Sequence, residues 1–215
     1  MSAEAQPRRS RQSAQPSKGD RRELALREAA EELLATGRFD DTPVAEIARG
    51  AGISRATFYF YFSSKEALLA SVVDDAVTGF NARILAVLSP DRTSSPAAAL
   101  RASVEAAADL WWEHRIVLCA SVALGTMVPE VYERARVNIA AVREPTVALL
   151  MRHGTVPEAE EEREATELVT ALILMTERNF YDLMRGEPSR ADVDELADRL
   201  ARIWLRSFGL EAQSR

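Results

Sequence analysis

The chain has 215 residues, of which 47% are hydrophobic and 28% are charged, and its formal net charge at pH 7 is −6. This composition supports a buried core and excludes a collagen-like or wholly disordered chain. The longest uncharged stretch, Ile116 to Pro129, is too short to cross a bilayer as a helix, and no apolar run follows the N-terminal arginines as a secretory signal would require. One cysteine, Cys119, and two distant histidines predict neither an intrachain disulfide nor a clustered metal site. We therefore expect a cytoplasmic protein without a cofactor.

Positive charge is concentrated near the N-terminus. The first 66 residues carry eleven Lys and Arg against ten Asp and Glu, whereas the remainder carries sixteen against twenty-three. Within the first 22 residues only Glu4 and Asp20 oppose six basic side chains, which are Arg8, Arg9, Arg11, Lys18, Arg21 and Arg22. Such a segment suits a polyanionic partner, and a solvated tail explains the same charges equally well. Charge alone leaves both interpretations open.

Helical signals begin near residue 20, after a segment without periodic apolar residues. Residues 1–19 are expected to form a disordered basic arm. Asp20 is the expected N-cap of a first helix, and Gly37 its expected terminator. Thr42 followed by Pro43 predicts the start of a second, short helix, because proline suits the first helical position.

Further helices are expected along the rest of the chain. Glycines at 50–52 break the second helix, and Ser54 is the expected N-cap of a third that reaches Tyr61. A long helix is expected from Ser64 onwards. Beyond a Ser- and Pro-rich loop, apolar spacing predicts helices at about 97–113, 116–126, 129–152, 162–185 and 190–208. We expect a kink at Pro145. No segment requires a strand, so the predicted fold class is all-α with about nine helices.

Residues 42–69 carry the most informative pattern, a short helix, a glycine turn and a second short helix. This helix-turn-helix arrangement suits DNA, because the second helix enters the major groove with its N-terminal end. Ser54, Ala56 and Thr57 are small enough for close approach to base edges. Arg55 can reach a guanine edge or a phosphate.

The same helix continues into an aromatic run. Tyr59, Tyr61 and Lys65 are expected to contact the phosphate backbone through their hydroxyl and ammonium groups. The phenylalanines of the run are expected to pack in the core, and these are Phe58, Phe60 and Phe62.

The run from Gly52 to Leu68 (GISRATFYFYFSSKEAL) resembles the DNA-binding domain of the TetR family of one-component regulators. The segments Leu174–Arg178 and Ile203–Trp204 resemble, more narrowly, the subgroup of the mycobacterial ethionamide repressor. The resemblance implies a homodimer with an N-terminal three-helix DNA-binding domain, here residues 20–67, and a larger helical ligand-binding and dimerisation domain, here residues 68–215. It also implies DNA contacts from Thr42, Arg55, Thr57, Tyr59, Tyr61 and Lys65. At position 56 this sequence has alanine, where the subgroup frequently has proline or glycine. We expect this difference to alter base preference without abolishing DNA binding.

Later helices carry apolar stripes that mix large aromatic residues with small ones. At helical spacing these are Leu100, Val104, Ala107 and Trp111; Ile139, Val142, Thr146 and Leu149; and Ile173, Thr176, Phe180 and Met184, with Trp204 on the last helix. Periodicity alone favours an ordinary core. The small, partly polar positions and the family resemblance favour a cavity for a small apolar ligand. Glu177, one turn from Phe180, fits either a ligand contact or a partner for an arginine.

The last two helices carry a further apolar face, formed by Leu168, Leu172, Met175, Leu183, Leu196, Leu200 and Ile203. Two such helices from each chain would make a four-helix dimer interface. Burial within the chain's own body explains the same pattern.

These features predict a repressor that binds a palindromic DNA operator as a homodimer and is released by a small hydrophobic ligand. An activator on the same scaffold, or a ligand carrier with a vestigial DNA-binding head, are the alternatives. Enzymatic chemistry finds no support, because His114 beside Glu113 lacks a third partner and Cys119 lies in an apolar run.

Overall fold

A computed structural model of the chain describes residues 17–89, 95–125, 129–155 and 159–210. Within these ranges the chain forms nine α-helices and no strand, which confirms the predicted all-α class. The helices are α1 (Lys18–Ala35), α2 (Val44–Gly50), α3 (Arg55–Tyr61), α4 (Lys65–Val87), α5 (Pro96–Glu113), α6 (Arg115–Gly125), α7 (Pro129–Arg152), α8 (Ala159–Met184) and α9 (Arg190–Ser207). The predicted basic arm lies outside the described residues up to residue 16, and its last residues instead begin α1.

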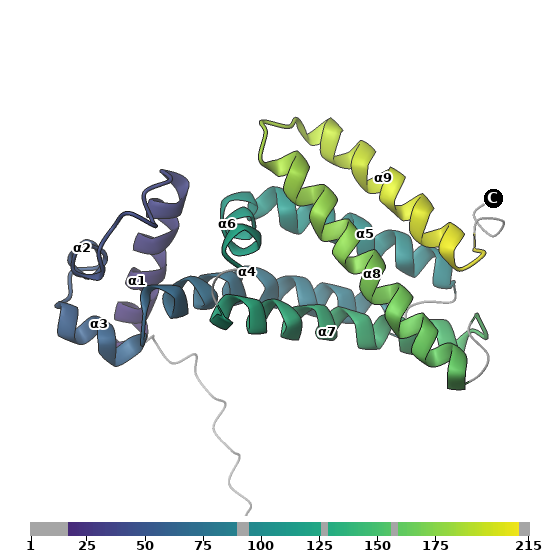
Figure 1. Cartoon of the computed structure of the whole chain (residues 1–215), viewed down its shortest axis with the longest axis horizontal. Coiled ribbons are helices and arrows are strands. Elements are labelled where there is room, and N and C mark those ends of the chain that lie inside the picture. The colour runs from purple at the N-terminus through teal and green to yellow at the C-terminus, as the bar shows by residue number, and fades with distance from the viewer. Residues whose placement is uncertain (1–16, 90–94, 126–128, 156–158, 211–215) are drawn as a thin grey trace, which may run out of the picture.

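The helices form a small head and a larger body along the long axis of the molecule (Figure 1). The head consists of α1, α2 and α3, and the body contains α5 to α9. α4 belongs to both, because it leaves the head and runs beside α7 through the body. α9 packs on α5 and α8, and α6 contacts α1 where the body meets the head. No helix among the described residues combines the length and the apolar character that a membrane span needs.

Two predicted helix starts need correction. Ser17, not Asp20, is the N-cap of α1, and Asp20 accepts a hydrogen bond of 2.8 Å from the Ser17 backbone amide in a capping box. Pro43 is the N-cap residue of α2 and makes no side-chain cap. Thr42 is buried, and its hydroxyl donates to the Arg38 carbonyl oxygen at 2.7 Å. Thr42 therefore holds the loop between α1 and α2 instead of capping α2.

Other local signals act as predicted. The Ser54 and Ser64 side chains accept backbone amides three residues further on, at 3.1 and 3.0 Å, and so cap α3 and α4. Gly52 has a φ of 69° and makes the turn between α2 and α3. Pro145 lies inside α7, as expected, and the helix continues past it to Arg152, whereas the expected kink stays a prediction. α8 begins at Ala159, so that much of the acidic run near its start is already helical.

A continuous apolar core joins the head to the body. Leu26 of α1, Ile47 of α2 and Phe58 of α3 are fully buried in the head. Leu68 and Leu69 of α4 belong to the same cluster, which continues through the later helices of the body. The head and the body are therefore packed on one continuous core along α4.

Candidate DNA-binding surface and ligand cavity

The recognition helix α3 buries one side and exposes the other. Phe58 is fully buried in the head, as predicted, whereas 82% of the Phe60 surface is exposed. The predicted burial of Phe60 is therefore wrong. Two residues correspond to a rotation of about 200° around a helix, so Phe60 points away from the core that holds Phe58. Tyr59 is also exposed, as predicted. Both phenylalanine side chains are apolar, so only their angular separation around the helix could have predicted that Phe58 is buried and Phe60 exposed.

The N-terminal end of α3 is ordered by its own side chains. The Ser54 hydroxyl oxygen accepts the Thr57 amide and lies 2.8 Å from the Thr57 hydroxyl oxygen. The Arg55 guanidinium carbon lies 5.7 Å from the centre of the Tyr59 ring, a cation–π contact. Ala56, between them, is exposed and adds little bulk. One exposed surface thus presents hydroxyl, guanidinium and phenol groups, which are suited to base edges and phosphates.

Other residues with predicted phosphate contacts are engaged within the chain. The Lys65 ammonium donates hydrogen bonds to the backbone carbonyl oxygens of Phe39 and Asp40, at 3.0 and 2.7 Å. Thr42 is buried under the same loop. Tyr61 is half-buried, with its ring edge-on to that of Phe60. Lys65 and Thr42 therefore stabilise the loop between α1 and α2. The exposed side chains of α3 are more accessible to DNA than these two residues.

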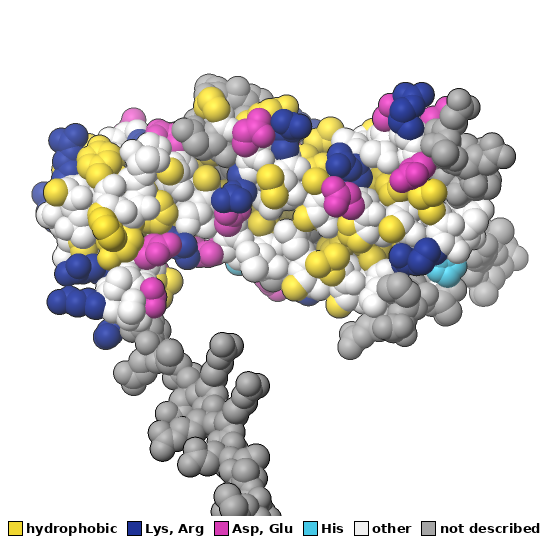
Figure 2. All heavy atoms as spheres, turned by 90° about the horizontal axis from the view of Figure 1, so that it is seen from below, with side chains coloured by type: hydrophobic (Ala, Val, Ile, Leu, Met, Phe, Trp, Pro, Cys, Tyr) yellow, Lys and Arg dark blue, Asp and Glu magenta, His cyan; other side chains and the backbone are white. Residues whose placement is uncertain are grey.

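Basic side chains surround the outer end of the head (Figure 2). The exposed cations of its described part are Lys18, Arg21, Arg22, Arg38, Arg49 and Arg55. Arg38 and Arg49 both pair with Glu46, at 3.3 and 3.9 Å, on the exposed side of α2. The head therefore combines an exposed recognition helix with positive charge, as a DNA-binding surface requires.

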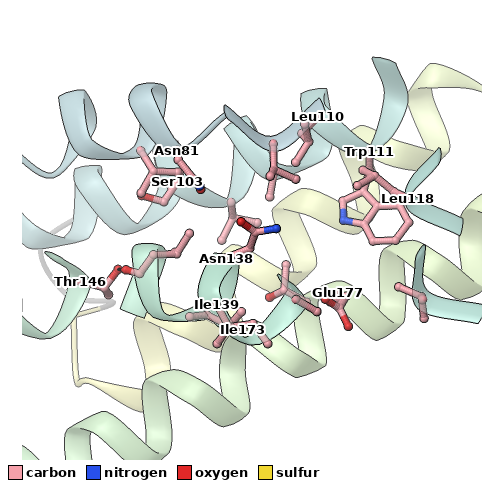
Figure 3. A pocket seen from close by; sticks show the side chains of 18 of the residues that line it. Asn81, Ser103, Leu110, Trp111, Leu118, Asn138, Ile139, Thr146, Ile173 and Glu177 are labelled. Carbon is pink, nitrogen blue, oxygen red and sulfur yellow. Dashed lines mark hydrogen bonds between the residues drawn. The ribbon is translucent and has the colours of Figure 1, made fainter. Parts of the chain in front are cut away.

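A cavity of about 140 Å³ lies in the body, with walls from α4, α5, α6, α7, α8 and α9 (Figure 3). Three residues of the predicted stripes, Leu149, Phe180 and Met184, do not line it and are buried. The predicted residues that do line it are Leu100, Val104, Ala107, Trp111, Ile139, Val142, Thr146, Ile173, Thr176, Glu177 and Trp204. Phe180 is fully buried behind the wall, where its ring stacks on Trp111 with the centroids 6.3 Å apart. Phe180 supports the cavity wall instead of forming it.

Polar residues that the sequence reasoning missed also line the cavity, namely Asn81, Ser103, Ser121 and Asn138. The Asn81 side-chain oxygen is buried without a hydrogen-bond partner in the described structure. The hydroxyls of Ser103 and Thr146 instead donate to backbone carbonyl oxygens of their own helices, each at 2.8 Å. The apolar stripes gave no signal for Asn81 or Asn138, because both are polar residues whose orientation depends on how α4 and α7 pack.

Glu177 is the one ionisable side chain in the described cavity wall, which contains no Lys, Arg or His. The Glu177 carboxyl group has no ion pair or hydrogen bond with a described residue, and the neighbouring Arg178 pairs with Asp182 at 3.1 Å. Burial raises the pKa of Glu177 above that of an ordinary glutamate, because desolvation penalises the charged form. The sequence left two roles open for Glu177, a ligand contact and a partner for an arginine. No described arginine pairs with Glu177. In the described residues, no group of three or more His, Cys, Asp or Glu is arranged to hold a metal ion.

Comparisons with known proteins agree with both parts of this geometry. The family model for bacterial regulatory proteins of the tetR family matches residues 26–72, and the model for the C-terminal domain of the transcriptional regulator EthR matches residues 100–209. The HTH-type transcriptional regulator EthR of Mycolicibacterium smegmatis is 32% identical over 204 residues, covering 93% of this chain and 91% of the relative. EthR of Mycobacterium tuberculosis H37Rv is 32% identical over 200 residues, covering 93% and 92%.

Solved structures share the fold. A TetR-family regulator from Mesorhizobium loti superposes with a TM-score of 0.65 at 19% identity, covering 89% of this chain and 98% of that one. Thermus thermophilus FadR, a TetR-family repressor solved with lauroyl-CoA, has a TM-score of 0.59 at 24% identity, covering 85% and 93%. The two EthR proteins at 32% identity are transcriptional regulators, in agreement with the prediction that the protein is not an enzyme. The chain therefore belongs to the TetR family of bacterial transcriptional regulators, within the EthR subgroup.

Proposed function

We propose that the protein is a repressor that binds a palindromic operator as a homodimer and leaves it when an apolar molecule fills the cavity in the body. The observation that carries this proposal is that α4, the helix that enters the head, also forms part of the cavity wall through Val73, Val77, Asn81 and Ile84. A ligand in the cavity would therefore press directly on the helix that positions the head.

The connection along α4 is short. The Lys65 ammonium at its first turn holds the α1–α2 loop, and Val73 follows eight residues later, about 12 Å along the helix axis. A small shift of α4 at Val73 would reorient the head and change the separation of the two recognition helices in a dimer. The ligand weakens operator binding by preferring the conformation whose heads do not fit the operator.

Exposed apolar residues on α8 and α9 support a homodimer. Leu168 and Ile203, from the face expected from the sequence, are exposed, and so is Leu174, which that face did not include. Exposed apolar patches often mark protein interfaces. Other members of the face expected from the sequence are buried in the chain's own body, and these are Leu172, Leu196 and Leu200. The proposed interface therefore keeps only part of the apolar face expected from the sequence and adds Leu174 to it. Pairing α8 and α9 of each chain would form a four-helix bundle.

A two-fold dimer would read a palindrome, with half-sites about 34 Å apart if they are separated by one helical turn. Arg55, Thr57 and the capped start of α3 would contact bases, and Tyr59 and Phe60 would lie against the backbone or thymine methyl groups. Because bacterial operator DNA lies in the cytoplasm, we expect the protein to act there. The complex of the related FadR with lauroyl-CoA supports a ligand with a long apolar part in this fold.

The proposal is tested by selecting binding sites from random DNA duplexes at low salt and then titrating the selected site. We expect a palindromic site, bound by two chains. Recovery of only non-palindromic sequences would refute the dimeric operator. Ligand-tightened binding to a palindrome would instead indicate an activator or a corepressor-dependent regulator on the same scaffold.

A further inference from the structure

The described wall of the cavity contains one acidic side chain and no basic one. Glu177 supplies a carboxyl group to an otherwise apolar wall, and no described residue pairs with it. An unpaired carboxylate in such surroundings is unfavourable unless it is neutralised by a proton or by a positive charge. A ligand that carries the positive charge would remove this penalty.

The same charge pattern disfavours an anion. A carboxylate or phosphate in the cavity would lie near Glu177 with no Lys, Arg or His of the described wall to compensate it. Repulsion between like charges increases as the local dielectric constant falls, so an acidic headgroup is rejected more strongly here than at the surface. A neutral ligand would fill the apolar space and leave the carboxyl group unpaired.

An aromatic surface lies at the same end of the cavity as Glu177. The Trp111 ring lines the wall and stacks on Phe180 behind it, and Phe180 follows Glu177 by three residues on α8. Figure 3 shows Glu177 and Trp111 toward one end, whereas Asn81, Ser103 and Thr146 lie toward the other. A carboxylate and an indole ring at the same end of an apolar cavity form a combination that favours an ammonium group, through the ion pair and the cation–π attraction.

The opposite end accommodates the rest of such a ligand. Ser103 precedes Trp111 by eight residues on α5, which corresponds to about 12 Å along the helix. Between these positions the wall is lined by apolar side chains such as Val104, Ala107 and Ile139. A medium-length alkyl chain can extend from the Glu177 end into this region.

We propose that the cavity binds an organic cation, an apolar molecule with a protonated amine, and that the Glu177 carboxylate is its counter-ion. The regulatory consequence rests on the proposed function, because only a ligand-released repressor would convert this binding into operator release.

The test compares three probes with the same chain and different headgroups, namely octylamine, octanol and octanoate, at pH 7. Trp111 and Trp204 line the cavity, so their fluorescence reports binding of each probe. We expect octylamine to bind at least tenfold more tightly than octanol, and octanoate to bind most weakly. Equal or tighter binding of octanoate would overturn the proposal.

Variants then identify the counter-ion. Glu177→Gln should lower octylamine affinity at least tenfold and leave octanol affinity within twofold, whereas Glu177→Asp should keep the preference for the amine. Glu164→Gln is the matched control, because it removes an exposed carboxylate from the same helix. Unchanged octylamine affinity in folded Glu177→Gln would refute the assignment.

Operator binding measured with and without octylamine separates the two proposals. Release of the operator by octylamine in the wild type, but not in Glu177→Gln, would support both. Amine-selective binding that leaves operator affinity unchanged would support the cation site and refute the ligand-released repressor.

Discussion

The Trp204 indole nitrogen donates a hydrogen bond of 3.0 Å to the Thr176 hydroxyl oxygen and thereby joins α9 to α8 within the cavity wall. Both side chains are buried. The same two helices expose Leu174 and Ile203 on their outer surface. The Trp204–Thr176 bond therefore joins the two helices that carry both the cavity wall and the proposed dimer face.

Trp204→Phe should lower the free energy of unfolding by about 1–3 kcal/mol, because it removes a buried donor and leaves unfilled volume. Urea denaturation followed by circular dichroism measures this change. Trp112→Phe is the control, since Trp112 is exposed and its replacement should change stability by less than about 0.5 kcal/mol. Equal stability of the two variants would show that the buried hydrogen bond contributes nothing.

Two neighbouring alanines distinguish cavity from core. Ala107 lines the cavity, whereas Ala106 does not and is buried in a cluster that includes Leu88 and Leu149. Ala106→Trp should cost about 1–3 kcal/mol or more through overpacking. Ala107→Trp should stay close to wild type in thermal stability, bind operator about tenfold more weakly by mimicking the liganded state, and lose its response to ligand. Equal destabilisation by both substitutions would mean that the space is too small to hold a ligand.

The proposed dimer face can be tested by adding a negative charge to one of its apolar residues. Ile203→Glu should convert the dimer to monomer at micromolar concentration, because it places a carboxylate at the centre of an apolar interface. Sedimentation velocity measures the assembly state. Leu85→Glu adds the same charge at an exposed apolar position on α4 and should leave the dimer intact. A monomeric wild-type protein would contradict both the interface and the palindrome.

In the head, Lys65 and Phe60 should behave differently. Lys65→Ala removes two hydrogen bonds to the α1–α2 loop and should destabilise the head by about 1–3 kcal/mol, with faster amide exchange over residues 36–42. Phe60→Ala should leave stability unchanged, because the ring is exposed, and weaken operator binding by about 1–3 kcal/mol. Thermal melts and operator titrations of both variants check this. If Lys65→Ala is as stable as wild type, the hydrogen bonds of Lys65 to the loop do not contribute to stability, and phosphate binding is its remaining expected role.

The pKa of Glu177 is raised by burial, so the folded state holds this proton more tightly than the unfolded state does. Stability from this group is therefore present below the ordinary glutamate pKa of 4.5 and is lost as pH rises through the raised value. Glu177→Gln should be more stable than wild type at pH 7, with a smaller difference near pH 4.5. Urea denaturation at the two pH values measures this. A variant less stable than wild type at pH 7 would show that the ionised carboxylate has a stabilising partner.

The local elements of this protein were accessible from the sequence. Ser54 and Ser64 cap their helices through groups only three residues away, and no distant contact is needed to place them. The stripes on α5, α7 and α8 identified most of the wall that these three helices contribute, because a period of 3.6 residues determines which side chains share a face. They gave no indication of the wall that α4 and α6 contribute.

What lies opposite each face was decided by tertiary packing. Phe180 and Leu172 belong to apolar stripes like their neighbours, yet Phe180 supports Trp111 behind the wall and Leu172 is buried in the body. Asn81 enters the cavity only because α4 crosses the other helices at that point. Periodicity specifies the side of a helix, whereas the angle and spacing of the packed helices determine whether that side meets a core, a cavity or a second chain.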